Sequence, residues 1–95
     1  MPELKSEEAV GVVREYFRKP QVAAVEILRG TVKVGDSVRF RGFTTDFTQR
    51  IESMQVNHRD IPEAVKGDYV GILVVDRVRG NDHMFLESGD LEVSL

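Results

Sequence analysis

The sequence predicts an all-β domain, and three observations lead to that prediction. Short runs of Val, Ile and Phe recur at even spacing, whereas apolar residues at helical spacing are scarce. Gly-Asp and Gly-Asn pairs separate these runs, as expected for tight turns. A length of 95 residues fits one domain and is enough to bury a core. We predict six short strands that form a closed antiparallel barrel, because closure removes exposed strand edges.

The first three predicted strands show the clearest alternation of apolar and polar residues. Residues 10–17 form the first strand, which ends before Pro20 because proline cannot donate to a ladder. Residues 21–28 form the second strand. Its alternation directs Ala23, Val25 and Ile27 inward. Residues 31–36 form a connector that ends in a Gly-Asp turn, where glycine adopts positive φ at no steric cost. Residues 37–41 form the third strand.

The fourth predicted strand, residues 47–56, is long and irregular. Ile51 and Met54 lie at opposite parity, yet both are apolar enough to prefer the core. A β-bulge near residues 52–53 would direct both side chains inward, and it would add the curvature that a small barrel needs.

The last two predicted strands follow the longest connection, residues 61–68. This connection is expected to hold a short helical turn that starts at Pro62. Residues 69–78 form the most apolar strand and residues 83–87 form the sixth. The predicted barrel spans residues 10–87. A flexible or helical lead-in precedes it at residues 1–9, and a tail or short edge strand follows at residues 88–95.

Composition argues against several classes of function. The net charge of -3 shows no whole-chain basic character, although the middle of the chain is mildly basic and both ends are acidic. No cysteine is present for disulfides, thiol catalysis or cysteine-ligated zinc. No apolar run is long enough to span a membrane and the start does not resemble a signal peptide, so we expect a cytoplasmic protein with no membrane association.

The polar residues do not form a recognisable catalytic or metal-binding pattern. The two histidines lack ligand spacing, and the serine in the fourth strand lacks a nucleophile elbow. The aspartates that follow glycine or asparagine are expected to bond to turn backbone; these are Asp36, Asp68 and Asp82. We therefore expect no enzyme activity, no catalytic residue, no metal and no cofactor.

Arginine is the residue type that most strongly suggests binding. Arg39 and Arg41 project from the same side of one strand, and Arg77 and Arg79 project together around an inward valine. Arg50 points outward on the long strand. If these strands are neighbours, the five side chains form a basic patch suited to phosphate contacts. The alternative is cross-strand pairing with acidic residues, namely Glu26, Glu52 and Asp76.

The strand at residues 69–78 is apolar on both faces, although a barrel has only one interior. The face that includes Tyr69, Leu73 and Val75 must then be covered or left as an exposed apolar stripe. We expect a terminal segment or a protein partner to lie over Leu73 and Val75.

Three segments resemble the second domain of translational GTPases. Residues 30–38, GTVKVGDSV, are similar to its G-x-ϕ-K-ϕ-G-D-x-ϕ signature. Residues 51–55, IESMQ, resemble its ϕ-x-S-M-Q strand, and residues 64–72, AVKGDYVGI, resemble its A-x-x-G-D-x-V-G-ϕ segment. Their order and spacing agree across most of the chain. The resemblance implies a six-stranded Greek-key barrel. No G-x-x-x-x-G-K-[ST] loop is present, so we expect no GTP binding.

The resemblance leaves two hypotheses of function. In translation factors this domain contacts tRNA or ribosomal RNA, which implies a stand-alone module that binds RNA, the ribosome or a translation-related partner through the outward arginines. Similar barrels also occur at the C-terminus of some collagenase-like peptidases. The alternative is therefore a protein–protein adaptor appended to a peptidase or a modifying enzyme.

Overall fold

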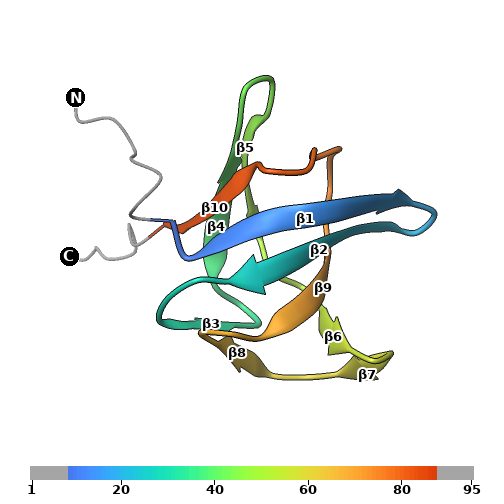
Figure 1. The fold of residues 1–95 in the computed structure, drawn as a ribbon. Helices are drawn as coiled ribbons and strands as arrows, with labels where there is room; N and C mark the ends of the chain where they lie inside the picture. The colour runs from blue at the N-terminus through green and yellow to red at the C-terminus, as the bar shows by residue number, and fades with distance from the viewer. Residues whose placement is uncertain (1–8, 88–95) are drawn as a thin grey trace.

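The computed structural model describes residues 9–87, which contain ten β-strands and no helix (Figure 1). The strands are β1 (Gly11–Arg18), β2 (Gln21–Ile27), β3 (Thr31–Lys33), β4 (Ser37–Arg41), β5 (Asp46–Arg50), β6 (Met54–Val56), β7 (Arg59–Asp60), β8 (Glu63–Val65), β9 (Tyr69–Leu73) and β10 (His83–Leu86). Within these residues no helix is long and apolar enough to cross a membrane. The all-β prediction is confirmed. The predicted lead-in and tail lie outside the described residues, apart from Ala9, which is buried.

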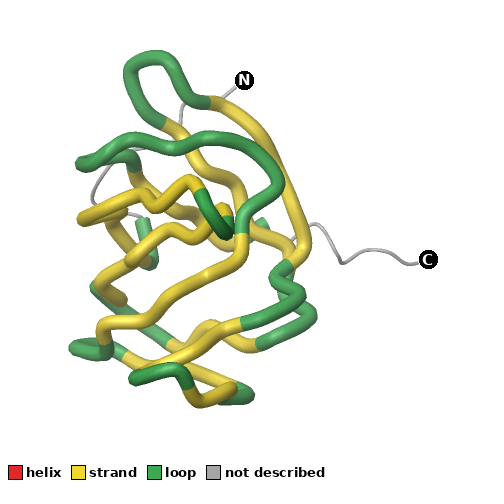
Figure 2. The backbone as a smooth tube through the Cα atoms, turned by 90° about the vertical axis from the view of Figure 1, so that its right-hand side faces the viewer, coloured by secondary structure: helices red, strands yellow, loops and turns green. Residues whose placement is uncertain are grey.

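Eight strands form one antiparallel sheet in the order β5-β4-β10-β1-β2-β9-β6-β7, and β3 pairs with β8 separately. The strands wrap around a single interior (Figure 2). The two ends of the sheet, β5 and the β6–β7 hairpin, come from one stretch of chain, because β5 and β6 are separated only by Ile51, Glu52 and Ser53. At these residues the chain leaves its partner β4 and reaches its partner β9.

The predicted closed barrel of six strands is not found. The strand pairs form an open series from β5 to β7, and the described residues contain ten strands rather than six. The extra strands have two origins. The predicted strand at 47–56 is interrupted near the predicted bulge and becomes β5 and β6, and its residues Ile51 and Met54 are both buried as expected. The segments predicted as connectors supply the others, β3, β7 and β8.

The pairing of β3 with β8 joins residues about thirty positions apart, with Val32 opposite Ala64. Both side chains are fully buried and complete one end of the core. The helical turn predicted at Pro62 is therefore wrong, because the segment that follows it pairs as a strand. A partner so distant in the chain leaves no local pattern that could have indicated this pairing.

Aspartate carboxylates close three turns in the same way, which confirms their predicted role. In each turn the carboxylate accepts a hydrogen bond from a backbone N–H three residues earlier, at 2.8–2.9 Å. The aspartates are Asp36, Asp68 and Asp82. Gly35 has a φ of 99°, which meets the expectation for the first of these turns.

The core is formed by the alternation that the sequence predicts. In β2 the residues Ala23, Val25 and Ile27 are buried, and in β4 the residues Val38 and Phe40 are buried. The last predicted strand before the final turn is shorter than expected, because β9 ends at residue 73. The remainder, residues 74–82, forms a loop that still directs two valines into the core. This loop connects both candidate surfaces described below.

Candidate functional site

The outer face of β1, β2 and β9 carries an apolar row. Phe17 lies opposite Val22, and Val22 lies opposite Leu73, so the three side chains cross the sheet on the same face. Phe17 is 49% exposed and Leu73 is 43% exposed, so neither is covered within the described structure. Val75 follows in the chain and is more exposed still. We call these four residues the apolar patch.

Small side chains and an aromatic ring continue this face. In the next row Ala24 lies opposite Gly71, so the surface there is shallowly recessed between larger side chains. In the row beyond, Tyr69 lies opposite Glu26 and its side chain is exposed. Glu26 accepts two hydrogen bonds from Arg14, at 2.7 and 2.9 Å, so its charge is paired. On β1 the exposed Glu15 lies opposite Ala24, so the margin of the apolar patch carries one carboxylate besides the Glu26–Arg14 pair, and Tyr69 lies beyond it on β9.

A buried glutamine holds the end of β9 against β5. Gln49 is only 7% exposed, and its Nε2 donates to the carbonyl oxygen of Leu73 at 3.0 Å. Its Oε1 accepts from the backbone N–H of Val75 at 2.9 Å. The side chain thus takes the place of a missing backbone pair between these segments. It fixes the start of the loop that bears Val75.

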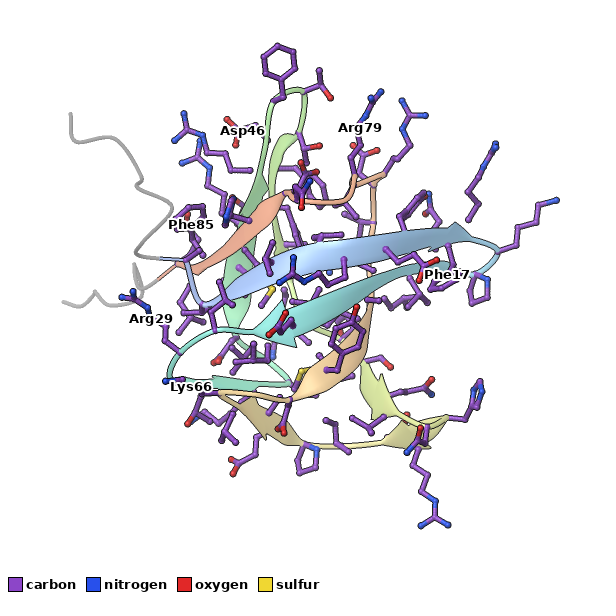
Figure 3. All side chains as sticks on the ribbon, in the orientation of Figure 1. Phe17, Arg29, Asp46, Lys66, Arg79 and Phe85 are labelled. Atoms are coloured by element: carbon purple, nitrogen blue, oxygen red, sulfur yellow. The ribbon has the colours of Figure 1, made fainter. Side chains whose placement is uncertain are left out.

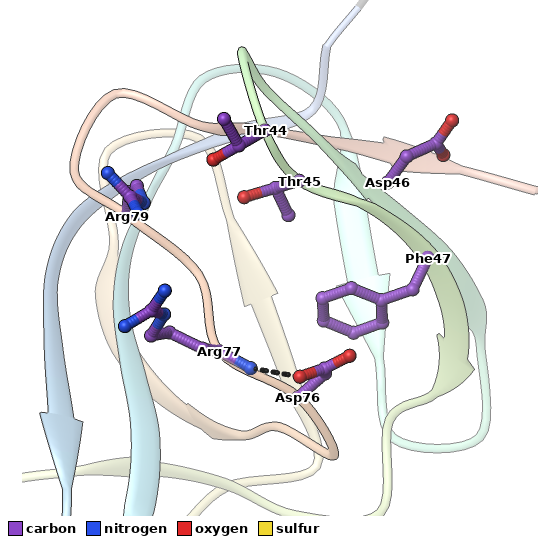
Figure 4. A pocket seen from close by; sticks show the side chains of 7 residues that line it. All are labelled: Thr44, Thr45, Asp46, Phe47, Asp76, Arg77 and Arg79. Atoms are coloured by element: carbon purple, nitrogen blue, oxygen red, sulfur yellow. Dashed lines mark hydrogen bonds between the residues drawn. The ribbon is translucent and has the colours of Figure 1, made fainter.

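A pocket of about 230 Å³ lies between the β4–β5 hairpin and the loop that follows β9 (Figure 4). Arg77 and Arg79 lie on the loop side, and Thr44 and Thr45 lie on the hairpin side. The complete lining is Thr44, Thr45, Asp46, Phe47, Asp76, Arg77 and Arg79. Figure 3 places Phe17 and Arg79 at separate parts of the molecule, so the pocket and the aromatic end of the patch are distinct surfaces.

The two walls of the pocket are held together by close packing. Asp82, which is buried, accepts a hydrogen bond from the backbone N–H of Arg79 at 2.8 Å. The same carboxylate lies so near Gly42 that a Cβ at that position would collide with it. Gly42 in turn donates its N–H to the carbonyl of Thr45 at 2.8 Å. The absence of a side chain at residue 42 therefore sets the distance between hairpin and loop.

The carboxylates of the pocket are already engaged. Arg39 donates to both oxygens of Asp46, at 2.8 and 3.0 Å. This hydrogen bonding, with the positive charges of Arg39 and Arg41, lowers the pKa of Asp46 although desolvation opposes the shift. Asp76 accepts from the backbone N–H of Arg77 at 2.8 Å. Among the described residues no carboxylate forms an ion pair with Arg77 or Arg79.

The structure brings together only some of the predicted arginines. Arg39 and Arg41 project outward from β4 beside Asp46, and Arg77 and Arg79 line the pocket. Arg50 lies at the opposite end of β5, across from Ser37, and is not part of the pocket. The predicted acidic partners differ as well. The partner of Arg39 is Asp46, and Glu26 is bound by Arg14.

Several residues of these surfaces were not identified from the sequence. Phe17 was assigned to a strand without a role, although two consecutive aromatic residues in a strand must point to opposite faces. Phe43 is fully exposed at the tip of the β4–β5 hairpin. Thr44 and Thr45 lack a sequence signal, because their role depends on a loop more than thirty residues away.

The described residues offer no metal-binding arrangement. No group of three or more His, Cys, Asp or Glu side chains in residues 9–87 is arranged to hold a metal ion. The features that remain are an apolar face and a polar pocket on an all-β scaffold.

Comparison with known proteins identifies the family. Residues 21–81 match the family described as elongation factor Tu domain 2, and the chain belongs to that family. The resemblance proposed from the three sequence segments is thereby confirmed.

Relatives of the chain include proteins named as a protease and a collagenase. The chain is 35% identical over 78 residues to the uncharacterized protease MJ0090 of Methanocaldococcus jannaschii, covering 81% of the chain and 19% of that protein. It is 31% identical over 77 residues to a collagenase of Porphyromonas gingivalis, covering 80% and 21%. The chain thus spans about a fifth of these relatives. A solved C-terminal domain of a Geobacillus thermoleovorans protein assigned as a U32 peptidase has a TM-score of 0.79, with 25% identity and coverage of 90% and 99%.

Proposed function

We propose that this chain is a non-catalytic docking domain that binds another protein domain through the apolar patch. The observation behind the proposal is the row Phe17, Val22 and Leu73 across three paired strands, which is apolar, half-buried at Val22 and exposed at both ends. Removal of such apolar surface from water is the dominant favourable contribution in most protein–protein association. At the margin of the patch Glu26 is paired with Arg14, so a partner that covers Glu26 does not bury an isolated charge there.

The partner that fits best is the main body of a U32 peptidase-type protein. The chain corresponds to about a fifth of a protease and of a collagenase, and the Geobacillus domain is the C-terminal part of a protein assigned as a U32 peptidase. A domain attached to a larger body needs only a small apolar contact, because attachment gives a high effective concentration. This favours the adaptor hypothesis over RNA or ribosome binding. Arg39, on which the RNA hypothesis depends, is already bound to Asp46.

A chimeric protein tests the proposal. The matching segment of protease MJ0090 is replaced by this chain, and the patch is probed by Leu73→Cys. Because the chain contains no cysteine, this thiol is its only maleimide target within the domain, and peptide mass spectrometry measures its modification. We expect modification of Leu73→Cys to be much slower in the chimera than in the isolated chain.

A matched control is available on β8, where Val65 is 45% exposed and lies outside the patch. Val65→Cys should react at the same rate in both proteins. Equal rates for Leu73→Cys in the two proteins would overturn the proposal. Salt-sensitive binding of tRNA or ribosomes to the isolated chain, lost in Arg39→Ala/Arg41→Ala, would favour the RNA hypothesis instead.

A further inference from the structure

We propose that the pocket between the β4–β5 hairpin and the loop after β9 binds a phosphate group. No residue of the apolar patch lines this pocket, and nothing in the proposed docking function requires it. The pocket measures about 230 Å³, which is ample for a tetrahedral oxyanion. Its lining supplies hydrogen-bond donors from two opposite sides (Figure 4).

The loop side supplies two guanidinium groups. Arg77 and Arg79 line the pocket without a carboxylate partner among residues 9–87. Arginine presents several N–H groups in a planar fork that matches phosphate oxygens. The backbone N–H of Arg79 donates a hydrogen bond to Asp82, which holds the Cα from which the Arg79 side chain extends.

The hairpin side supplies a buried hydroxyl that has no other role. Thr45 is only 7% exposed, and its side chain forms no hydrogen bond within the described structure. Figure 4 shows its hydroxyl directed toward the side of the pocket where Arg79 lies, with its methyl group turned away. Because the hydroxyl faces the pocket and has no hydrogen-bond partner among residues 9–87, it is available to donate to an acceptor that enters the pocket beside Arg79.

Charge favours an anion despite two carboxylates in the lining. Asp46 is neutralised by the two hydrogen bonds from Arg39 and has Arg41 opposite it on β4. The remaining carboxylate is Asp76, opposed by Arg77 and Arg79. Donors on both sides suit the oxygens of a tetrahedral phosphate, which point in several directions, better than a planar carboxylate.

NMR titration of the amides of the intact chain tests the proposal, with inorganic phosphate as the probe and chloride used to keep ionic strength constant. We expect saturable shifts at residues 44–46 and 76–79, and about tenfold weaker binding in each of Arg77→Gln and Arg79→Gln, because each removes a charge-assisted hydrogen bond. Arg50→Gln removes the same charge outside the pocket and should leave the dissociation constant unchanged. Thr45→Val keeps the shape and removes the hydroxyl, so it should also weaken binding.

Two further titrations test how the charge of Asp76 affects phosphate affinity and whether the phosphate belongs to a nucleotide. Asp76→Asn retains the acceptor for the N–H of Arg77 but removes a negative charge, so it should strengthen binding. A nucleoside monophosphate that binds more tightly than inorganic phosphate, with the gain lost in Phe43→Ala, would identify a nucleotide; equal affinity would identify a simple phosphate. Absence of saturable shifts, equal shifts with acetate, or equal loss in Arg50→Gln would overturn the proposal.

Discussion

Replacing Gln49 by leucine should destabilise the domain far more than a comparable change on the surface. The substitution keeps the approximate size of a side chain that is 7% exposed, but removes its three hydrogen bonds. The carbonyl of Leu73 and the N–H of Val75 then lose their partners, and the carbonyl of the adjacent Arg50 loses one hydrogen bond at 3.1 Å. Each such group costs about 1–3 kcal/mol when water cannot replace the bond.

The net effect follows from two opposing contributions. Two unpartnered backbone groups cost roughly 2–6 kcal/mol, and burial of the leucine returns about 1–2 kcal/mol. Both backbone groups lie at the margin of the core, so the lower half of their cost applies, about 2–4 kcal/mol. Subtracting the return of about 1–2 kcal/mol from a cost of about 2–4 kcal/mol leaves a loss of roughly 1–2 kcal/mol, which lowers the Tm of a domain of this size by about 5–15 °C.

Thermal unfolding followed by circular dichroism measures the change, and hydrogen exchange at the amide of Val75 tests its cause. Gln55→Leu is the matched control, since this exposed glutamine makes a single hydrogen bond to Asp60 at 3.0 Å. Its Tm should change by no more than about 3 °C. A Tm of Gln49→Leu within that same margin, with the amide of Val75 still protected, would refute the bridging role of Gln49.

Three other predictions concern the turns and one ion pair. Gly42→Ala should destabilise the domain by roughly 1–3 kcal/mol in chemical denaturation, because its Cβ would strike the carboxylate on the facing loop. Gly35→Ala should cost about 1–2 kcal/mol because of its positive φ, whereas Gly80→Ala, with ordinary φ and ordinary contacts, should be nearly neutral; equal losses would contradict this reasoning. The pKa of Asp46 is lowered by Arg39, so their interaction stabilises the fold above the unfolded pKa and is lost as pH falls through the folded value. Asp46→Asn should therefore be less stable than the natural chain at pH 7, with a difference that shrinks below about pH 4; a difference that is constant with pH would exclude the linkage.

The arrangement of side chains within each strand was predictable, because the alternation of a strand is a local property. The buried set in β2 and β4 followed from period two, and the aspartate turns followed from their spacing. The outward direction of Tyr69, Leu73 and Val75 was also expected from alternation with buried neighbours. The family could be recognised because its turn motifs are short and local.

The pairing of segments was not predictable in the same way. The strand pair β3–β8 joins segments about thirty residues apart, and the ion pair of Arg39 with Asp46 depends on the hairpin register. The burial of Thr45 depends on a loop that arrives from the far end of β9. None of these contacts leaves a periodic signal in the chain.

The sequence by itself determined that the chain forms β-strands around one core, which residues face that core, and where the main turns fall. It did so because strand geometry couples each side chain only to its near neighbours in the chain. Only the tertiary structure decided that the sheet remains an open series of pairs, that Phe17 joins Leu73 in one patch, and that two threonines face two arginines across a pocket. These features depend on which distant segments pack together, and that is set by the shape of the whole core rather than by any single stretch of residues.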